Sequence, residues 1–60
     1  MDEKAMFRIG SKVTHDRHPG VVFKVIKKNW RKGAVIYNVE SLDPTGPVLL
    51  GVHQDDLNKI

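Results

Sequence analysis

Sixty residues without cysteine limit this chain to one small domain that has no disulfide to stabilise it. Hydrophobic residues make up 40% and charged residues 28%, which is typical of a soluble globular domain, and no apolar run approaches the roughly 20 residues of a membrane-spanning helix. The first residues, Met-Asp-Glu-Lys, lack the apolar core of a signal peptide, so we expect a cytoplasmic protein with no membrane partner. Because so short a chain builds only a small core, self-association is one way for it to bury more surface.

The net charge of +3 is unevenly distributed. Residues 8–32 carry eight cations and one acid, for +7, whereas residues 1–7 carry −1 and residues 33–60 carry −3. A basic segment of this kind attracts phosphate or an acidic protein surface. The alternative is that these cations only solvate the exposed faces of strands.

Strands are predicted throughout, because glycine and proline interrupt every window long enough for an amphipathic helix. Segments rich in β-branched and aromatic residues lie between these breaks, at residues 11–15, 21–28, 34–41 and 47–52. Turn residues connect them at 16–20, 29–33 and 43–46, and the glycine that ends 29–33 predicts a hairpin tip that contains Trp30.

The strand at 34–41 has one apolar face, so we expect Tyr37 and Val39 to point inward. In residues 21–27 both faces are apolar, which predicts either a bent strand that changes its facing or burial by a partner chain. Acids in residues 54–57 favour a short 3₁₀ turn before a last strand at 58–60.

These elements predict an all-β fold, a five-stranded SH3-like barrel over residues 7–60 with a short 3₁₀ turn before the last strand. Residues 1–6 lack periodicity and are expected to form a flexible tail. The predicted core consists of Val13, Val22, Val25, Tyr37, Val39, Leu49, Leu57 and Ile60.

Four short motifs resemble the layout of small SH3-like barrels: Phe7-x-Ile9-Gly10-x-x-Val13, Gly20-x-Val22, Tyr37-x-Val39 and Leu57-x-x-Ile60. KOW and Tudor-like modules and the RNA-polymerase-interacting domain of CarD-type regulators share that layout. The resemblance covers residues 7–60 and implies a fold more than a function, since the matching positions are turn glycines and core residues.

The outline is also similar to the plasmid-borne type B dihydrofolate reductases. That resemblance implies a Gln-Ile-Tyr run after Val48, where this chain has Leu49, Leu50 and Gly51. It also implies a lysine shortly after Val13, where His15 and Asp16 stand instead. No catalytic residue is therefore carried over from the reductases.

No other pattern points to an enzyme, a cofactor or a metal. His15 and His18 form a pair without a third ligand, which is more typical of turn residues than of a metal site. Asp55 and Asp56 are adjacent and diverge, so they do not share a proton as a catalytic pair does. We expect a protein that is not an enzyme.

The most informative cluster surrounds the single tryptophan, and we predict a nucleic-acid-binding surface formed by Lys24, Lys27, Lys28, Trp30, Arg31 and Lys32. Exposed aromatic rings stack on bases while neighbouring cations neutralise phosphates. Two alternatives stay open: Trp30 caps one end of the barrel, or it contacts a protein.

The sequence thus favours a binding module for DNA, RNA or a protein of the transcription or replication machinery. The alternative is a protein-interaction or self-assembling module, in which Leu49, Leu50 and Val52 form an exposed apolar strand edge and a homo-oligomer interface.

Overall fold

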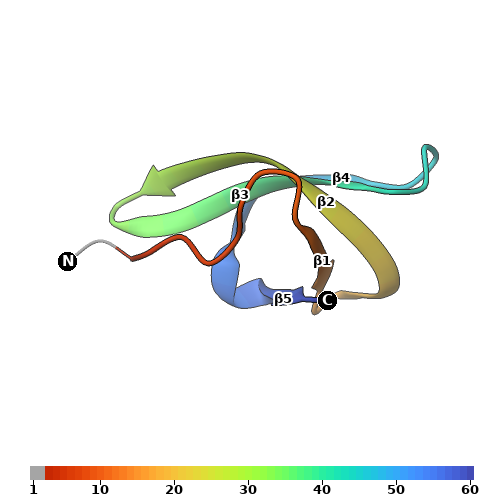
Figure 1. Cartoon of the computed structure of the whole chain (residues 1–60), viewed down its shortest axis with the longest axis horizontal. Helices are drawn as coiled ribbons and strands as arrows, with labels where there is room; N and C mark the ends of the chain where they lie inside the picture. The colour runs from red at the N-terminus through yellow and green to blue at the C-terminus, as the bar shows by residue number, and fades with distance from the viewer. Residues whose placement is uncertain (1–2) are drawn as a thin grey trace.

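Turns divide the chain into five strands and one short 3₁₀ helix (Figure 1). The structure, a computed structural model, describes residues 3–60. Its elements are β1 (Lys12–His15), β2 (His18–Arg31), β3 (Ala34–Ser41), β4 (Val48–His53), η1 (Gln54–Asp56) and β5 (Leu57–Lys59). No helix in the described part of the chain has the length and apolar character needed to cross a membrane.

All strand pairs are antiparallel and belong to one sheet with the order β4-β3-β2-β1-β5. The predicted all-β class, the five strands and the 3₁₀ turn before the last strand are confirmed. The long strand β2 curves through the molecule, so that β1 and β5 lie across the core from β3 and β4 (Figure 1). This curvature encloses the apolar face of the sheet.

Two of the three predicted turns are shorter than expected. The β1–β2 turn contains only residues 16 and 17, and the β2–β3 turn only residues 32 and 33. The β3–β4 turn agrees with the prediction, since the Gly46 N–H donates to the Asp43 carbonyl at 2.8 Å, the bond that closes a β-turn.

The core contains five of the eight predicted residues, together with Phe7, Phe23 and Val35, and its members are Phe7, Val13, Phe23, Val25, Val35, Tyr37, Val39 and Leu57. Of the other three predictions, Leu49 packs on this cluster while partly exposed, and Val22 is half-buried. Ile60 was predicted wrongly and is 67% exposed, because β5 ends at Lys59 and leaves the last residue outside the sheet.

A bulge changes the facing of β2 part-way along the strand. In β2, Val25 pairs with Val39 and Lys27 pairs with Asn38, so Ile26 is an extra residue between two ladder positions. Phe23 and Val25 point inward before this bulge, and the facing changes after it. The predicted change of facing thus occurs, but only beyond Val25, and it does not bring the second apolar phase into the core: Val22 is half-buried and Ile26 is 38% exposed.

A second bulge lies in β4, where Gly51 has a φ of 65° that favours glycine. Its N–H donates to Asn38 Oδ1 at 3.0 Å. Because of the extra residue, Leu49 and Val52 both pack on the core although they are three positions apart.

The N-terminal residues 3–6, expected as part of a flexible tail, lie along the barrel and bind it through hydrogen bonds. Glu3 N–H donates to the Gly33 carbonyl at 2.7 Å, and Met6 N–H donates to the Tyr37 hydroxyl at 3.1 Å. The expected tail residues 1 and 2 lie outside the described part of the chain.

Candidate nucleic-acid interface

The end of the β2–β3 hairpin is formed by a two-residue turn. Lys32 and Gly33 have φ angles of 52° and 81°, and the flanking residues Arg31 and Ala34 pair directly. Two consecutive positive φ angles are the mark of the type I′ turn, whose twist matches that of the strands. Trp30 is therefore a strand residue opposite Val35, and its predicted place at the tip of the loop is wrong.

The bulge at Ile26 decides which side chains of the hairpin share a face. Residues that pair directly across two antiparallel strands point to the same side of the sheet. Lys28 pairs with Tyr37, and Trp30 pairs with Val35; both partners are completely buried, so this is the inner face.

The other side of the hairpin, called the outer face below, is defined by three cross-strand pairs: Lys27 with Asn38, Asn29 with Ile36 and Arg31 with Ala34. Its three β2 side chains are exposed. Lys32 lies in the turn between the two faces. The six residues predicted as one site thus gather at one hairpin but are divided between two faces of it.

Lys24 differs from the other cations of the cluster. It pairs with Glu40 across β2 and β3, and its Nζ lies 3.7 Å from Glu40 Oε1. The other four cations, Lys27, Lys28, Arg31 and Lys32, form no ion pair with any acid among residues 3–60. Within this cluster, the unpaired positive charge therefore lies toward the end of the hairpin; outside it, Lys4, Arg8, Lys12, Arg17 and Lys59 also form no ion pair among residues 3–60.

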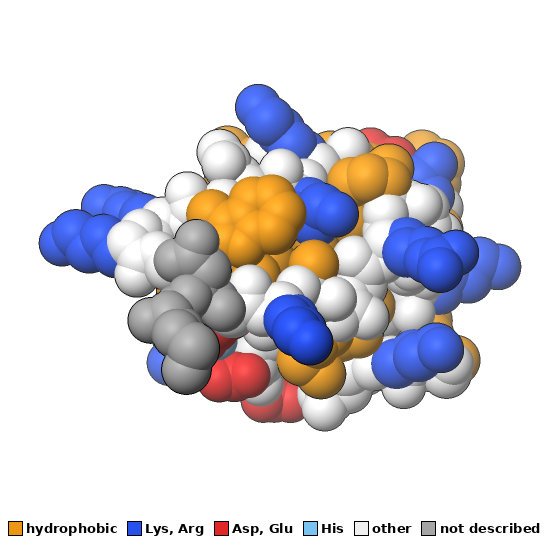
Figure 2. All heavy atoms as spheres, turned by 60° about the vertical axis from the view of Figure 1, so that its left-hand side comes forward, with side chains coloured by type: hydrophobic (Ala, Val, Ile, Leu, Met, Phe, Trp, Pro, Cys, Tyr) orange, Lys and Arg blue, Asp and Glu red, His pale blue; other side chains and the backbone are white. Residues whose placement is uncertain are grey.

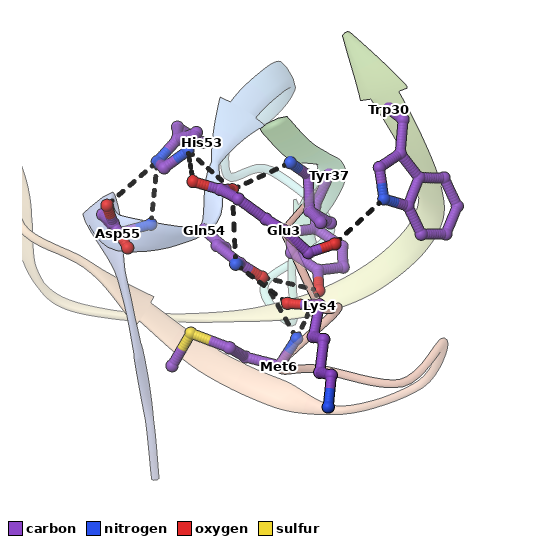
Figure 3. Close-up of polar contacts among 9 residues, drawn as sticks. Glu3, Lys4, Met6, Trp30, Tyr37, His53, Gln54 and Asp55 are labelled. Atoms are coloured by element: carbon purple, nitrogen blue, oxygen red, sulfur yellow. Dashed lines mark hydrogen bonds and ion pairs between the residues drawn. The ribbon is translucent and has the colours of Figure 1, made fainter. Parts of the chain in front are cut away.

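Trp30 is partly exposed, as a contact residue would be, and partly packed against its own chain, as a capping residue would be. Its side chain is 46% exposed, and the ammonium of Lys28 lies 5.5 Å from the ring centroid, a cation–π arrangement. Its indole N–H points to the Glu3 carbonyl at 3.4 Å, as Figure 3 shows. The ring therefore lies against the N-terminal segment while much of it stays accessible.

Figure 2 shows the left-hand side of the molecule as it appears in Figure 1. Lysine and arginine side chains lie among exposed apolar areas there, and acidic side chains are visible at the lower edge and at the upper right. This face thus combines apolar contact area with positive charge.

A polar cluster that the sequence analysis missed fixes the N-terminal segment beside this hairpin (Figure 3). The Glu3 carboxylate accepts from the Val35 N–H at 3.0 Å and lies 3.0 Å from His53 Nε2. Gln54 is buried, and its amide nitrogen donates to the Lys4 carbonyl at 3.0 Å. In the sequence, the only signal for this cluster is a glutamine that follows a predicted strand. This pattern is too common to predict a polar cluster.

Glu3, His53 and Asp55 could each offer one ligand atom to a cation, since these atoms lie within 4.8 Å of one another. His53 Nδ1 accepts from the Asp55 N–H at 3.1 Å, and Nε2 faces Glu3. The two ring nitrogens thus have different partners: Nδ1 caps η1, and Nε2 holds the Glu3 carboxylate. These contacts explain the cluster without a cation. The other histidine pair, His15 and His18, packs edge to face at 5.3 Å.

A shallow groove of about 230 Å³ lies between the start of β2 and the β3–β4 turn. Val21, Val22, Leu42 and Pro47 provide most of its apolar lining. Asp43 is its one acidic residue, and hydrogen bonds from the backbone and then the hydroxyl of Thr45 lower the pKa of that carboxyl. The groove contains none of the predicted site residues.

The predicted apolar interface residues lie in β4, which forms one edge of the sheet. Leu50 is 72% exposed, whereas Leu49 and Val52 pack against the core. Only one of the three therefore offers most of its side chain to a partner.

No protein-family model, no curated protein and no solved structure gives a significant match to this chain. The resemblance to SH3-like modules stays a prediction, and the functional argument depends on the geometry of the hairpin.

Proposed function

We propose that this protein is a non-enzymatic module that binds nucleic acid through the β2–β3 hairpin. The observation that supports it is the group of four exposed cations, Lys27, Lys28, Arg31 and Lys32, without acidic partners among residues 3–60. Exposed cations gathered on one element form the electrostatic pattern that attracts phosphates. The half-exposed ring of Trp30 adds a surface for contact with bases or sugars.

The hairpin is positioned to reach a partner. Its last two pairs, Trp30 with Val35 and Arg31 with Ala34, extend beyond the last β4 pair, His53 with Ile36. In Figure 1 this end of the hairpin projects from the body of the molecule. In a cell, this surface would bring the protein to DNA, RNA or the transcription and replication machinery assembled on them.

Salt dependence of binding tests the proposal. Fluorescence anisotropy with labelled single- and double-stranded DNA and RNA should show affinity that falls with salt, with a slope of about −0.7 to −0.9 on logarithmic axes for each phosphate contacted. A triple variant, Lys27→Ala, Lys28→Ala and Lys32→Asn, should weaken binding and flatten this slope. Asparagine is chosen at position 32 because Asn-Gly suits a type I′ turn.

A matched control removes the same number of charges outside the hairpin, at Lys4, Arg17 and Lys59, all of which are exposed. This control should leave the salt slope nearly unchanged. If it reduces binding as much as the hairpin variant does, general charge explains the affinity. If wild-type protein binds none of the four nucleic acids at low salt, the proposal is wrong.

The second candidate function, self-assembly, is supported by the open edge of β4. This strand has a pairing partner on one side only, and both Leu50 and Val48 are more than half exposed. An exposed apolar edge strand can pair with another chain. Sedimentation equilibrium at micromolar concentration should then show a homo-oligomer, and Leu50→Lys should return it to the monomer mass; a wild-type monomer mass throughout would contradict this function.

A further inference from the structure

We infer that the outer face of the β2–β3 hairpin enters the major groove of duplex DNA and contacts guanine edges there. This inference rests on the proposed function and specifies its ligand. A B-form major groove is about 12 Å wide and admits a two-stranded β-ribbon. The projecting end of the hairpin is such a ribbon, with a tight turn that adds no bulky loop.

The outer face carries the side chains that recognise bases. Lys27, Asn29 and Arg31 alternate along β2, are exposed and lie on one side of the ribbon. Alternate residues of a strand are about 6.7 Å apart, which is close to two base-pair steps of about 3.4 Å each. The three side chains can therefore address every second base pair without distortion of the strand.

These side chains offer mostly hydrogen-bond donors. Lysine and arginine only donate. The Oδ1 atom of Asn29 accepts one hydrogen bond, from the backbone N–H of Trp30 at 2.9 Å, while no hydrogen bond within residues 3–60 uses its Nδ2 group. Guanine presents two acceptors, N7 and O6, in the major groove and is the base that a donor-rich surface matches best.

The cross-strand partners leave access to this face. Ala34 opposite Arg31 is small, and Ile36 opposite Asn29 is uncharged. The one acid of the sheet on the same side, Glu40, pairs with Lys24 and lies two ladder positions from Lys27. A phosphate backbone beside the ribbon would therefore meet Lys32 and the outer-face cations without a nearby unpaired carboxylate of the sheet.

Two other nucleic acids fit this face less well. Duplex RNA has a deep, narrow major groove that side chains cannot read. A single strand would use the inner face instead, where Trp30 offers a ring for stacking but Lys28 and Glu3 already occupy positions around it. These two ligands are the competing outcomes of the test.

The test compares duplex DNA probes of equal length at one salt concentration: a guanine-rich duplex, the same duplex with 7-deazaguanine, and an A·T duplex. Replacement of N7 by carbon removes one major-groove acceptor and keeps base pairing. Because a bidentate guanine contact is worth roughly five- to 150-fold, we expect about tenfold weaker binding of the 7-deazaguanine duplex. The matching duplex RNA and single strands should also bind more weakly.

Arg31→Lys tests the residue that should make this contact, since it keeps the charge and loses the planar fork of donors. It should reduce the preference for guanine over 7-deazaguanine and leave the salt slope unchanged. Arg17→Lys, the same change in the β1–β2 turn, should keep the preference. Lys28→Ala, on the inner face, should weaken binding to all duplexes alike.

Equal affinity for the guanine and 7-deazaguanine duplexes would overturn the inference, as would tighter binding of single strands that Trp30→Ala abolishes. Both results would leave the proposed function standing. Absence of binding to every probe would overturn the proposed function as well. Thermal melts of the variants confirm that each exposed substitution leaves the fold intact.

Discussion

The hydroxyl of Tyr37 gives the sharpest test of how the N-terminal segment is held. The Tyr37 side chain is completely buried, and its hydroxyl accepts from the N–H groups of Met6 and Phe7, each at 3.1 Å. Tyr37→Phe removes this acceptor and keeps the ring, whose edge contact with Phe7 has a centroid distance of 5.6 Å. Any loss of stability therefore comes from hydrogen bonding.

The expected loss of stability depends on which N–H groups lose their only acceptor. The Met6 N–H keeps Gln54 Oε1 as an acceptor at 3.1 Å, whereas the Phe7 N–H has no second acceptor among residues 3–60. One unsatisfied buried N–H costs about 1–3 kcal/mol, so we expect the free energy of unfolding to fall by about 2 kcal/mol. In a domain of this size, that loss lowers Tm by about 8–16 °C.

Urea and thermal unfolding, followed by circular dichroism, measure this effect. A double-mutant cycle with Gln54→Ala adds a second readout, because both side chains bind Met6 and their effects should not be additive. A loss below about 0.5 kcal/mol for Tyr37→Phe, within the range of neutral surface changes, would refute the reasoning.

Three further predictions concern the turns and bulges. Gly51→Ala should destabilise the protein by about 1–2 kcal/mol in urea unfolding, because alanine is strained at a φ of 65°. A steric collision is not the cause, since nothing lies within 4 Å of the Cβ position. An unchanged unfolding midpoint would argue against the bulge. Gly46→Ala should destabilise for a different reason, since its Cβ would collide with both Oγ and Cβ of Ser41, and Ser41→Gly in the same chain, which removes both atoms, should restore part of the loss. Asp43 has a lowered pKa in the folded state, so its contribution to stability is present above the usual aspartate pKa of about 3.9 and is lost as pH falls through the folded value. Asp43→Asn should remove this component from the pH dependence of Tm below about pH 4, and identical acid profiles for the two proteins would contradict it.

Much of the fold could be predicted because its determinants are local. The turn at 43–46 follows from proline and glycine at fixed positions, and the alternation around Tyr37 and Val39 identifies the inner face of β3. The short turn before the last strand follows from its two acids, Asp55 and Asp56, both of which lie in η1. Each of these signals spans only a few residues.

The errors arose where a single extra residue changes the phase of a strand. The predicted core contains Val22 and lacks Phe23, because both phases of residues 21–26 are apolar and do not show which one is buried. Nothing local identifies Ile26 as the bulged residue, since its position depends on the register with β3. Register is a property of two strands and cannot be determined from one segment.

The position of Trp30 was wrong for a related reason. Glycine at position 33 indicates a turn, but a type I′ turn also needs a positive φ at the preceding residue, and lysine there gives no sign of it. The predicted turn therefore contains five residues, whereas the observed turn has two. With the shorter turn, the residues of the basic cluster become strand residues with defined faces.

The two bulges and the tight turn together decide what the hairpin presents to a partner. If β2 alternated regularly through Ile26, without a bulge, Lys27 and Arg31 would point inward with Val25, and Lys28 and Trp30 would point outward. With it, Trp30 lies on the inner side against the N-terminal segment, and the donor groups of β2 occupy the opposite side. The bulge at Ile26 thus divides the basic run of the sequence between the two sides of the hairpin. One side contacts the chain's own N-terminal segment, and the other is free to meet a partner.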